Sequence, residues 1–169
     1  MLLYIYIGLF SSNLLIKFEV LMVTVKSSSF EETEALGEKL GKVLCGGEVI
    51  AYFGGLGMGK TCITRGIARG MGIGDDVSSP TFAIVNEYRG TPALYHFDMY
   101  RITGFDDLCS TGFFDYLDLG AVLAVEWSEN IENALPGEKL IKIEFSRGEN
   151  DDDRIITMSG DILYENSWR

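Results

Sequence analysis

The segment Gly54-Gly55-Leu56-Gly57-Met58-Gly59-Lys60-Thr61 decides the fold of this chain. It fits the pattern G-x-x-x-x-G-K-[ST], which is the phosphate-binding loop of ATP- and GTP-using proteins. Glycines let consecutive backbone N–H groups turn inward around phosphate oxygens, a conformation that side chains would obstruct. The pattern predicts that Lys60 places its positive charge at the β- and γ-phosphates and that the hydroxyl of Thr61 holds Mg²⁺.

The residues on either side of this loop supply the strand and the helix that it requires. Residues 48–53 are typical of a buried strand, and residues 61–71 carry apolar side chains at helical spacing. Such a helix aims the positive end of its dipole at the same anion. A merely flexible glycine-rich turn is the alternative, and the flanking elements make it the weaker interpretation. The nucleotide-binding residues predicted in the loop are Gly55, Leu56, Gly57, Met58, Gly59, Lys60, Thr61 and Cys62.

The composition limits the class of partner. At 169 residues the chain is long enough for one domain with a single core. Its net charge of −11 repels phosphate backbones, and no run of Lys or Arg offsets this, so strong direct binding to nucleic acid is not expected. A protein or small-molecule partner is favoured. The three cysteines show no C-x-x-C spacing, which indicates core packing in a reducing compartment and neither disulfides nor a zinc site.

The first 21 residues differ from the rest of the chain. They are mostly apolar, but they have no basic start and no small-residue cleavage site, and neither apolar run reaches the length of a membrane-spanning helix. We expect translation to begin at Met22, so that residues 1–21 are a non-native extension or an apolar tail and residues 22–169 form a single domain. A membrane anchor is the alternative interpretation of these residues, but it is the less favoured one, and we expect no role at a membrane.

Two acidic residues stand at strand ends, where phosphate-loop proteins keep a Mg²⁺ ligand or a catalytic base. Asp98 ends an apolar strand over residues 93–98, and Glu126 follows the continuous apolar run of residues 121–125. Both are candidates for the metal side of the site, and an ordinary solvated strand end is the alternative for each. His96, the sole histidine, is expected to be a hydrogen-bonding structural residue rather than a base, since phosphoryl transfer needs little proton chemistry.

The loop Ser79-Pro80-Thr81 follows a Gly/Asp stretch and carries hydroxyl groups on both sides of a proline. Because it comes after the phosphate-loop helix, it is placed to sense a γ-phosphate or to position water. A turn that caps the next strand is an equally good interpretation.

The remaining pattern completes an α/β protein. Residues 23–27 alternate as a strand, Ser29 and Glu32 form a capping box before a helical stripe that extends to Gly46, and residues 83–88 and 93–98 form a hairpin. Residues 140–145 and 154–158 are predicted to pair antiparallel across an acidic connection. The predicted architecture is a P-loop NTPase-type three-layer fold, with a mixed sheet of parallel core strands and an antiparallel extension.

Taken in order, these motifs resemble the bacterial TsaE (YjeE) family, the small ATPase of tRNA threonylcarbamoyladenosine biosynthesis. The resemblance covers about residues 22–160. The matching segments are Gly57-Met58-Gly59-Lys60-Thr61, Ser79-Pro80-Thr81-Phe82, Asn86-Glu87-Tyr88, His96-Phe97-Asp98-Met99-Tyr100-Arg101 and Glu126-Trp127. Gly55, Met58 and Cys62 depart from the usual family residues, which leaves the loop geometry intact because backbone amides do the binding.

The resemblance implies an activity and a set of roles. The protein would bind and slowly hydrolyse ATP with Mg²⁺ in the cytoplasm, as a regulator that resets a threonylcarbamoyl-transferase complex of TsaB- and TsaD-like proteins. Lys60 matches the phosphate lysine, and Thr61 and Glu126 match the Mg²⁺ ligands. Asp98 matches a residue needed for hydrolysis. The resemblance also makes Trp127 a neighbour of the nucleotide, Ser79–Phe82 a switch-type loop and Arg154 a nucleotide contact.

Two other functions fit the same loop. A small P-loop kinase would pass phosphate to a metabolite, but it usually needs a mobile lid with clustered arginines, and the arginines here are scattered. A scaffold that binds nucleotide without hydrolysis is the third interpretation, and the intact Lys60, Thr61, Asp98 and Glu126 argue against it.

Overall fold

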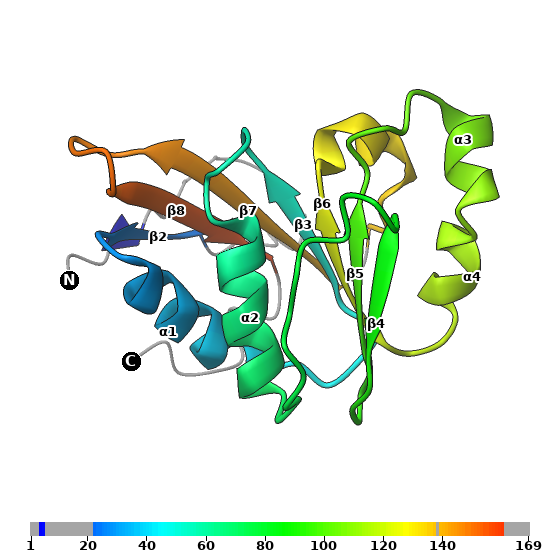
Figure 1. The fold of residues 1–169 in the computed structure, drawn as a ribbon, viewed down its shortest axis with the longest axis horizontal. Helices are drawn as coiled ribbons and strands as arrows, with labels where there is room; N and C mark the ends of the chain where they lie inside the picture. The colour runs from blue at the N-terminus through cyan, green and yellow to red at the C-terminus, as the bar shows by residue number, and fades with distance from the viewer. Residues whose placement is uncertain (1–3, 6–21, 138, 161–169) are drawn as a thin grey trace, which may run out of the picture.

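The computed structural model describes residues 4–5, 22–137 and 139–160 of the chain. These residues build one mixed sheet in the order β1-β2-β8-β7-β3-β6-β5-β4, with helices packed against it (Figure 1). The strands are β1 (Tyr4–Ile5), β2 (Met22–Ser27), β3 (Val49–Phe53), β4 (Val85–Tyr88), β5 (Leu94–Asp98), β6 (Val122–Glu126), β7 (Leu140–Arg147) and β8 (Arg154–Ser159).

The predicted mixture of strand directions is confirmed. The four central strands β5, β6, β3 and β7 run parallel to one another. At one edge, β4 pairs antiparallel to β5, and at the other edge β8, β2 and β1 continue the sheet with antiparallel pairings. Because parallel strands end at the same edge of a sheet, the segments that leave β3, β5 and β6 meet there.

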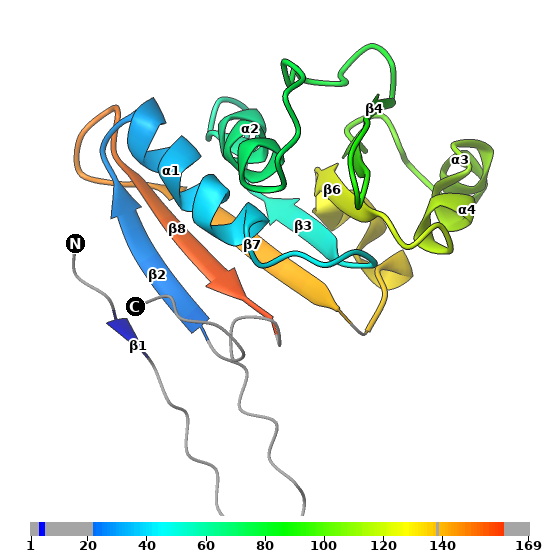
Figure 2. The ribbon, with the colours of Figure 1, turned by 90° about the horizontal axis from the view of Figure 1, so that it is seen from below.

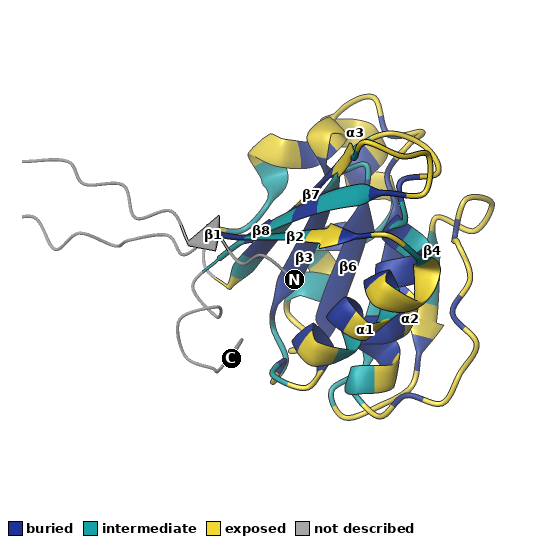
Figure 3. Ribbon diagram, turned by 90° about the vertical axis from the view of Figure 1, so that its left-hand side faces the viewer, coloured by how far each residue is buried: buried dark blue, intermediate teal, exposed yellow. Residues whose placement is uncertain are grey.

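Helices cover both faces of the sheet, which makes the fold three-layered (Figure 2). On one face lie α1 (Phe30–Gly41) and α2 (Lys60–Gly70), packed over a core that includes Ile50, Ile63 and Ile141. On the other face, α3 (Phe105–Ser110), α4 (Phe113–Leu117) and the 3₁₀ segment η1 (Ser128–Ala134) cover Phe97 and Leu123. Figure 3 shows the central strands β3 and β6 buried between these layers.

The two helices α1 and α2 approach each other until their backbones touch. A Cβ atom added at Gly37 would lie 2.2 Å from the carbonyl oxygen of Ile63, and one added at Gly66 would lie 2.0 Å from that of Glu34. Gly41 and Gly70, one turn further along each helix, show the same closeness. We call these four residues the glycine seam; it fixes the position of α1 against the helix that follows the phosphate-binding loop.

Several element boundaries depart from the sequence prediction, and two of these differences bear on the loops around the site. The helical stripe predicted to extend to Gly46 ends at Gly41, with Lys42 as the C-cap, and Val43 follows outside the helix. The strand predicted from Ala83 begins at Val85, because the carbonyl of Pro80 accepts the backbone N–H groups of Ala83 and Ile84 and closes a turn.

The cysteines also differ in part from expectation. All three are free, but only Cys62 is buried, whereas Cys45 and Cys109 are exposed, so core packing was the wrong prediction for these two.

Most of the N-terminal segment lies outside the described residues, and the start at Met22 stays a prediction. The exception is β1, where Tyr4 pairs with Thr24 and Ile5 with Val23. Among the described residues, no helix has the length and apolar character needed to cross a membrane.

Candidate functional site

The phosphate-binding loop connects β3 to α2, as the sequence predicts. Gly54, Gly57 and Gly59 adopt φ values of 128°, 73° and 105°, a region that favours glycine over residues with a Cβ. The N-cap of α2 is Gly59, which offers no side chain to the first turn, and that turn carries no acidic residue. The free N–H groups at the start of α2 therefore point at a position suited to an anion.

Lys60 lies directly behind this loop. Its ammonium donates hydrogen bonds to the carbonyl oxygens of Gly54 (2.6 Å) and Gly55 (3.0 Å), and it sits 4.0 Å from the centre of the Trp127 ring. Burial lowers the pKa of Lys60, and nearby carboxylates, chiefly that of Glu126, oppose this shift. Two of its three N–H groups are used by the loop, so one is left to meet a phosphate oxygen.

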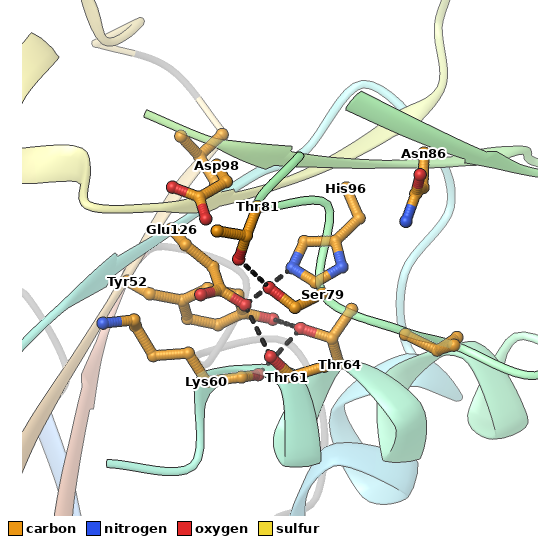
Figure 4. A network of polar contacts seen from close by, with 12 residues as sticks. Tyr52, Lys60, Thr61, Thr64, Ser79, Thr81, Asn86, His96, Asp98 and Glu126 are labelled. Atoms are coloured by element: carbon orange, nitrogen blue, oxygen red, sulfur yellow. Dashed lines mark hydrogen bonds and ion pairs between the residues drawn. The ribbon is translucent and has the colours of Figure 1, made fainter. Parts of the chain in front are cut away.

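Glu126 is the centre of the polar cluster shown in Figure 4. Its Oε1 accepts a hydrogen bond from the hydroxyl of Thr61 at 2.8 Å and contacts Nε2 of His96 at 2.9 Å. Burial alone would raise the pKa of Glu126, but the hydrogen bonds from His96 and Thr61 and the charge of Lys60 hold it below its ordinary value. The group is therefore a carboxylate at neutral pH and is fixed toward the first turn of α2.

Asp98 is the register partner of Glu126 on the neighbouring parallel strand. It is buried, and its Oδ1 accepts the backbone N–H of Tyr100 at 2.9 Å. The backbone N–H of Met99 donates to the carbonyl of Glu126 at 3.0 Å, which extends the β5–β6 pairing past the strand ends. The two predicted carboxylates thus lie side by side at the edge where the phosphate-binding loop begins.

These groups suit a hard cation that is shared with a phosphate. Within the described residues, no cluster of three or more His, Cys, Asp or Glu side chains forms a metal cage. Mg²⁺ does not require one, since it keeps several waters and takes one or two carboxylates together with phosphate oxygens. The hydroxyl of Thr61 and the carboxylate of Glu126, 2.8 Å apart, are oxygen donors of that kind.

The loop Ser79–Phe82, which the resemblance predicts to be a switch-type loop, is shown with this cluster in Figure 4. The hydroxyls of Ser79 and Thr81 are 2.7 Å apart and both residues are exposed. At its end, Ile84 adopts φ 70°, which is unusual for a β-branched residue, and its carbonyl accepts the backbone N–H of Asp98 at 2.9 Å. The loop is therefore a turn before β4, as one of its two interpretations holds, and it is tied to the strand that carries Asp98.

Arg154 reaches the phosphate-binding loop from β8. Its guanidinium donates to the carbonyls of Asp151 (2.6 Å) and Asp153 (2.9 Å), and its Nη2 lies 3.4 Å from the carbonyl oxygen of Gly57. A pocket of about 180 Å³ opens at this point. It is lined by Ser28, Ser29, Phe30, Glu31, Thr33, Gly57, Met58, Gly59, Asp152 and Arg154.

Not every predicted loop residue faces this site in the same way. Leu56 points into solvent with 86% of its surface exposed, whereas Met58 is buried and lines the pocket. The thiol of Cys62 donates to the carbonyl of Phe30 at 3.3 Å, on the α1 side, and burial raises the pKa of this thiol to about 11. Cys62 therefore takes part in helix packing, and only its backbone is placed for a phosphate.

Sequence reasoning missed that Ser28, Ser29 and Phe30, at the end of β2 and the start of α1, line this pocket. The capping box at Ser29 predicts where the helix begins, but it does not show that these residues lie beside the loop, which depends on the packing of α1 on α2. Sequence reasoning also gave His96 no partner, although the regular spacing of alternate residues on β5 places His96 on the same face as Asp98.

Comparison with known proteins identifies the family of this chain. The family model described as threonylcarbamoyl adenosine biosynthesis protein TsaE matches residues 27–156. The tRNA threonylcarbamoyladenosine biosynthesis protein TsaE of Bacillus subtilis is 41% identical over 130 residues, which cover 76% of this chain and 80% of that protein. The protein of the same name from Mycobacterium tuberculosis is 36% identical over 138 residues, which cover 76% and 82%.

The fold comparison leads to the same family. A crystal structure of Bacillus subtilis YdiB matches with a TM-score of 0.69 and 34% sequence identity, over 85% of this chain and 88% of that one. The match of the family model over most of the sequence, together with these relatives, shows that the chain belongs to the TsaE family of threonylcarbamoyl adenosine biosynthesis proteins.

Proposed function

We propose that this protein binds and hydrolyses ATP with Mg²⁺ and that this activity serves the threonylcarbamoyl modification of tRNA adenosine. One observation carries the proposal. At one edge of the sheet, a glycine loop at a helix N-terminus lies beside four side chains with suitable chemistry, those of Lys60, Thr61, Asp98 and Glu126. Membership of the TsaE family supplies the pathway.

In this mechanism the chain mainly positions and neutralises charge. The loop amides and the ammonium of Lys60 bind the β- and γ-phosphates, and the third N–H of Lys60 is free to meet a phosphate oxygen. Thr61 and Glu126 would hold Mg²⁺, which neutralises charge that develops on the phosphate oxygens. Glu126 is suited to this because its lowered pKa keeps it ionised.

Asp98 is the residue that we assign to the attacking water. One of its oxygens is fixed by the backbone N–H of Tyr100, which orients the carboxylate. Within the described residues its other oxygen accepts no hydrogen bond, so it is available to hold a water in line with the γ-phosphate. The hydroxyls of Ser79 and Thr81, on the loop tied to Asp98, are placed to respond to that phosphate.

The pocket beside Arg154 is proposed to hold the nucleoside part of ATP. It adjoins Gly57 and Gly59 of the loop, so a nucleotide whose phosphates lie in the loop can extend into it. Phe30, which lines the pocket, keeps 73% of its surface exposed and offers an aromatic face for a base.

The proposal includes action through protein partners in the cytoplasm. The net charge of −11 opposes direct binding to tRNA. Exposed apolar side chains stand around the site, with Leu56 on the phosphate-binding loop, Phe82 on the switch-type loop and Tyr100 after β5. We propose that these contact the TsaB- and TsaD-like proteins of the transferase complex and that hydrolysis resets that complex.

A metabolite kinase is less well supported, because the two arginines of α2, the helix that follows the loop, are already engaged in the fold. Arg65 donates to the carbonyl of Val77 at 3.0 Å, and Arg69 pairs with Glu34 at 3.0 Å. Neither is free to act as a lid over the phosphates.

The test is phosphate release from ATP, measured with the protein alone and with the partner proteins, in Mg²⁺ and in excess EDTA. Slow release that requires Mg²⁺ and rises with the partners supports the proposal. Transfer of phosphate to a metabolite would support a kinase instead. Binding without turnover in every mixture would contradict hydrolysis.

A further inference from the structure

We propose that His96 is a positioning residue for the metal-binding carboxylate: its imidazole N–H holds Glu126 in the orientation that Mg²⁺ requires. This inference rests on the proposed Mg²⁺–ATP function and assigns a role to the one histidine of the chain.

The contact between the two side chains fixes the direction of the hydrogen bond. Nε2 of His96 lies 2.9 Å from Oε1 of Glu126, and the histidine side chain is fully buried. A carboxylate oxygen can only accept, so the imidazole carries a proton on Nε2 whatever its charge. A ring nitrogen that donates to Glu126 is not available as a base toward water, which removes His96 from the chemical step.

The strand pairing explains why Glu126 needs such a donor. Asp98 and Glu126 are register partners on adjacent parallel strands, so two acidic side chains leave the sheet from neighbouring positions. Like charges placed opposite each other repel. His96 lies two residues before Asp98 on β5 and draws the Glu126 carboxylate back along the strands, while Thr61 fixes the same oxygen from the helix side. The carboxylate is thus held from the sheet and from α2 at once.

The other ring nitrogen shows that His96 is not simply a well-paired core residue. Nδ1 is buried and has no hydrogen-bond partner among the described residues. Burying a polar atom without a partner is unfavourable, and an apolar side chain of similar size would avoid it. The single contact that the imidazole makes with Glu126 is therefore the reason to place a histidine here. Groups that orient a ligating carboxylate in this way usually change metal affinity or activity by about 10- to 100-fold when they are removed.

The experiment compares His96→Gln with His96→Asn. The glutamine amide nitrogen takes the place of Nε2 and keeps the hydrogen bond to Glu126, whereas the shorter asparagine places its amide near Nδ1 and loses that bond. Both replacement side chains are polar and uncharged, so we expect burying them to destabilise the fold by similar amounts. For each variant, ATP binding is measured by calorimetry across a Mg²⁺ titration and again in EDTA, and hydrolysis is measured at saturating Mg²⁺.

We expect His96→Asn to raise the Mg²⁺ concentration for half-maximal ATP binding by about 10- to 100-fold. His96→Gln should stay within a few-fold of the unmodified protein, ATP affinity in EDTA should be unchanged in both, and the hydrolysis rate of His96→Asn should recover at high Mg²⁺. In a Glu126→Gln background, exchanging His96 should have no further effect on the Mg²⁺ response, because the oriented carboxylate is already gone.

Two outcomes would overturn the inference. The first is an equal Mg²⁺ response in His96→Gln and His96→Asn. The second is a fall in ATP affinity in EDTA that accounts for the whole loss, which would make His96 a purely structural residue. An unmodified protein whose ATP binding does not respond to Mg²⁺ at all would instead refute the proposed function, so the two failures are distinct.

Discussion

Thr61, in the first turn of α2, donates a hydrogen bond of 2.8 Å to Glu126 at the end of β6. The two residues are 65 positions apart in the chain, and they belong to different layers of the fold. This one contact joins the phosphate-binding loop to the carboxylate edge of the sheet, and the first two predictions test the two halves that it joins.

Replacing Lys60 by alanine should weaken ATP binding about 10- to 100-fold, because a charge-assisted hydrogen bond contributes about 1.5–3 kcal/mol. Calorimetric titration with ATP measures this. Lys142→Ala is the control, since Lys142 pairs with Glu132 on η1 and should leave ATP affinity unchanged. If Lys60→Ala binds ATP normally, the loop is not a phosphate site.

Glu126→Gln and Asp98→Asn should have different effects although both remove one carboxylate. We expect Glu126→Gln to shift the Mg²⁺ dependence of ATP hydrolysis to higher concentration. Asp98→Asn should keep the Mg²⁺ dependence and lower the rate by about 10²- to 10⁴-fold, the usual contribution of a positioned base. Mg²⁺ titrations of the hydrolysis rate separate the two, and the reverse pattern would exchange the roles of Asp98 and Glu126.

Asp153 should make the stability of the protein depend on acid pH. The hydrogen bond from Lys26, 2.9 Å away, is the largest of several contacts that together lower the pKa of Asp153 from 3.8 to about 2. Between these values the unfolded chain binds more protons than the folded one, so the contribution of Asp153 is complete above pH ~4 and is lost as the pH falls through ~2. Urea unfolding of the protein and of Asp153→Asn between pH 2 and 6 should show curves that differ most at the upper end and converge in acid. Lys26→Met should reduce the same difference, and an unaltered profile in that variant would contradict the pairing.

Gly66→Ala should destabilise the fold by about 1–3 kcal/mol, the usual cost of overpacking, despite alanine's higher helix propensity. The added methyl group would lie 2.0 Å from the carbonyl oxygen of Glu34, and a backbone atom cannot move aside cheaply. Gly74→Ala is the matched control, because nothing lies within 4 Å of its added Cβ, and we expect a change of less than about 1 kcal/mol. Thermal or urea unfolding measures the stability of both variants. Equal stability of the two would show that α1 and α2 can move apart to accommodate the added methyl group.

Trp127 should report nucleotide binding by fluorescence. Its ring lies 4.0 Å from the ammonium of Lys60, which we propose to bind a phosphate of the nucleotide. With Trp168→Phe as background, Trp127 is the only tryptophan, and MgATP should change its emission. The same protein with Lys60→Ala should lose the response at ATP concentrations that saturate the parent. A flat signal in the parent would place the nucleotide away from Trp127.

The parts of the site that follow from local pattern were predictable from the sequence. The glycine spacing gave the loop and its lysine. Asp98 and Glu126 were predicted as strand-end carboxylates at the metal side of the site, and they are register partners on adjacent parallel strands. The loop motif determines its own backbone conformation, and each carboxylate can be placed at a strand end from the apolar residues that precede it.

The parts that depend on contacts between distant segments were not predictable from local pattern. Arg154 was named by the family resemblance alone, and it reaches Gly57 because β8 lies beside β7 in the sheet. The pocket residues Ser28 to Phe30 reach the loop only through the glycine seam. The exposure of Cys45 and Cys109 likewise depends on which surface the other elements leave uncovered, which no local pattern records.

The glycine seam has a mechanical consequence. Because the backbones of α1 and α2 touch, we expect the two helices to move together as one rigid unit. If phosphate binding displaces the start of α2, the solvent-exposed face of α1 should therefore move with it. A protein docked there would register whether the nucleotide had arrived without touching the nucleotide itself.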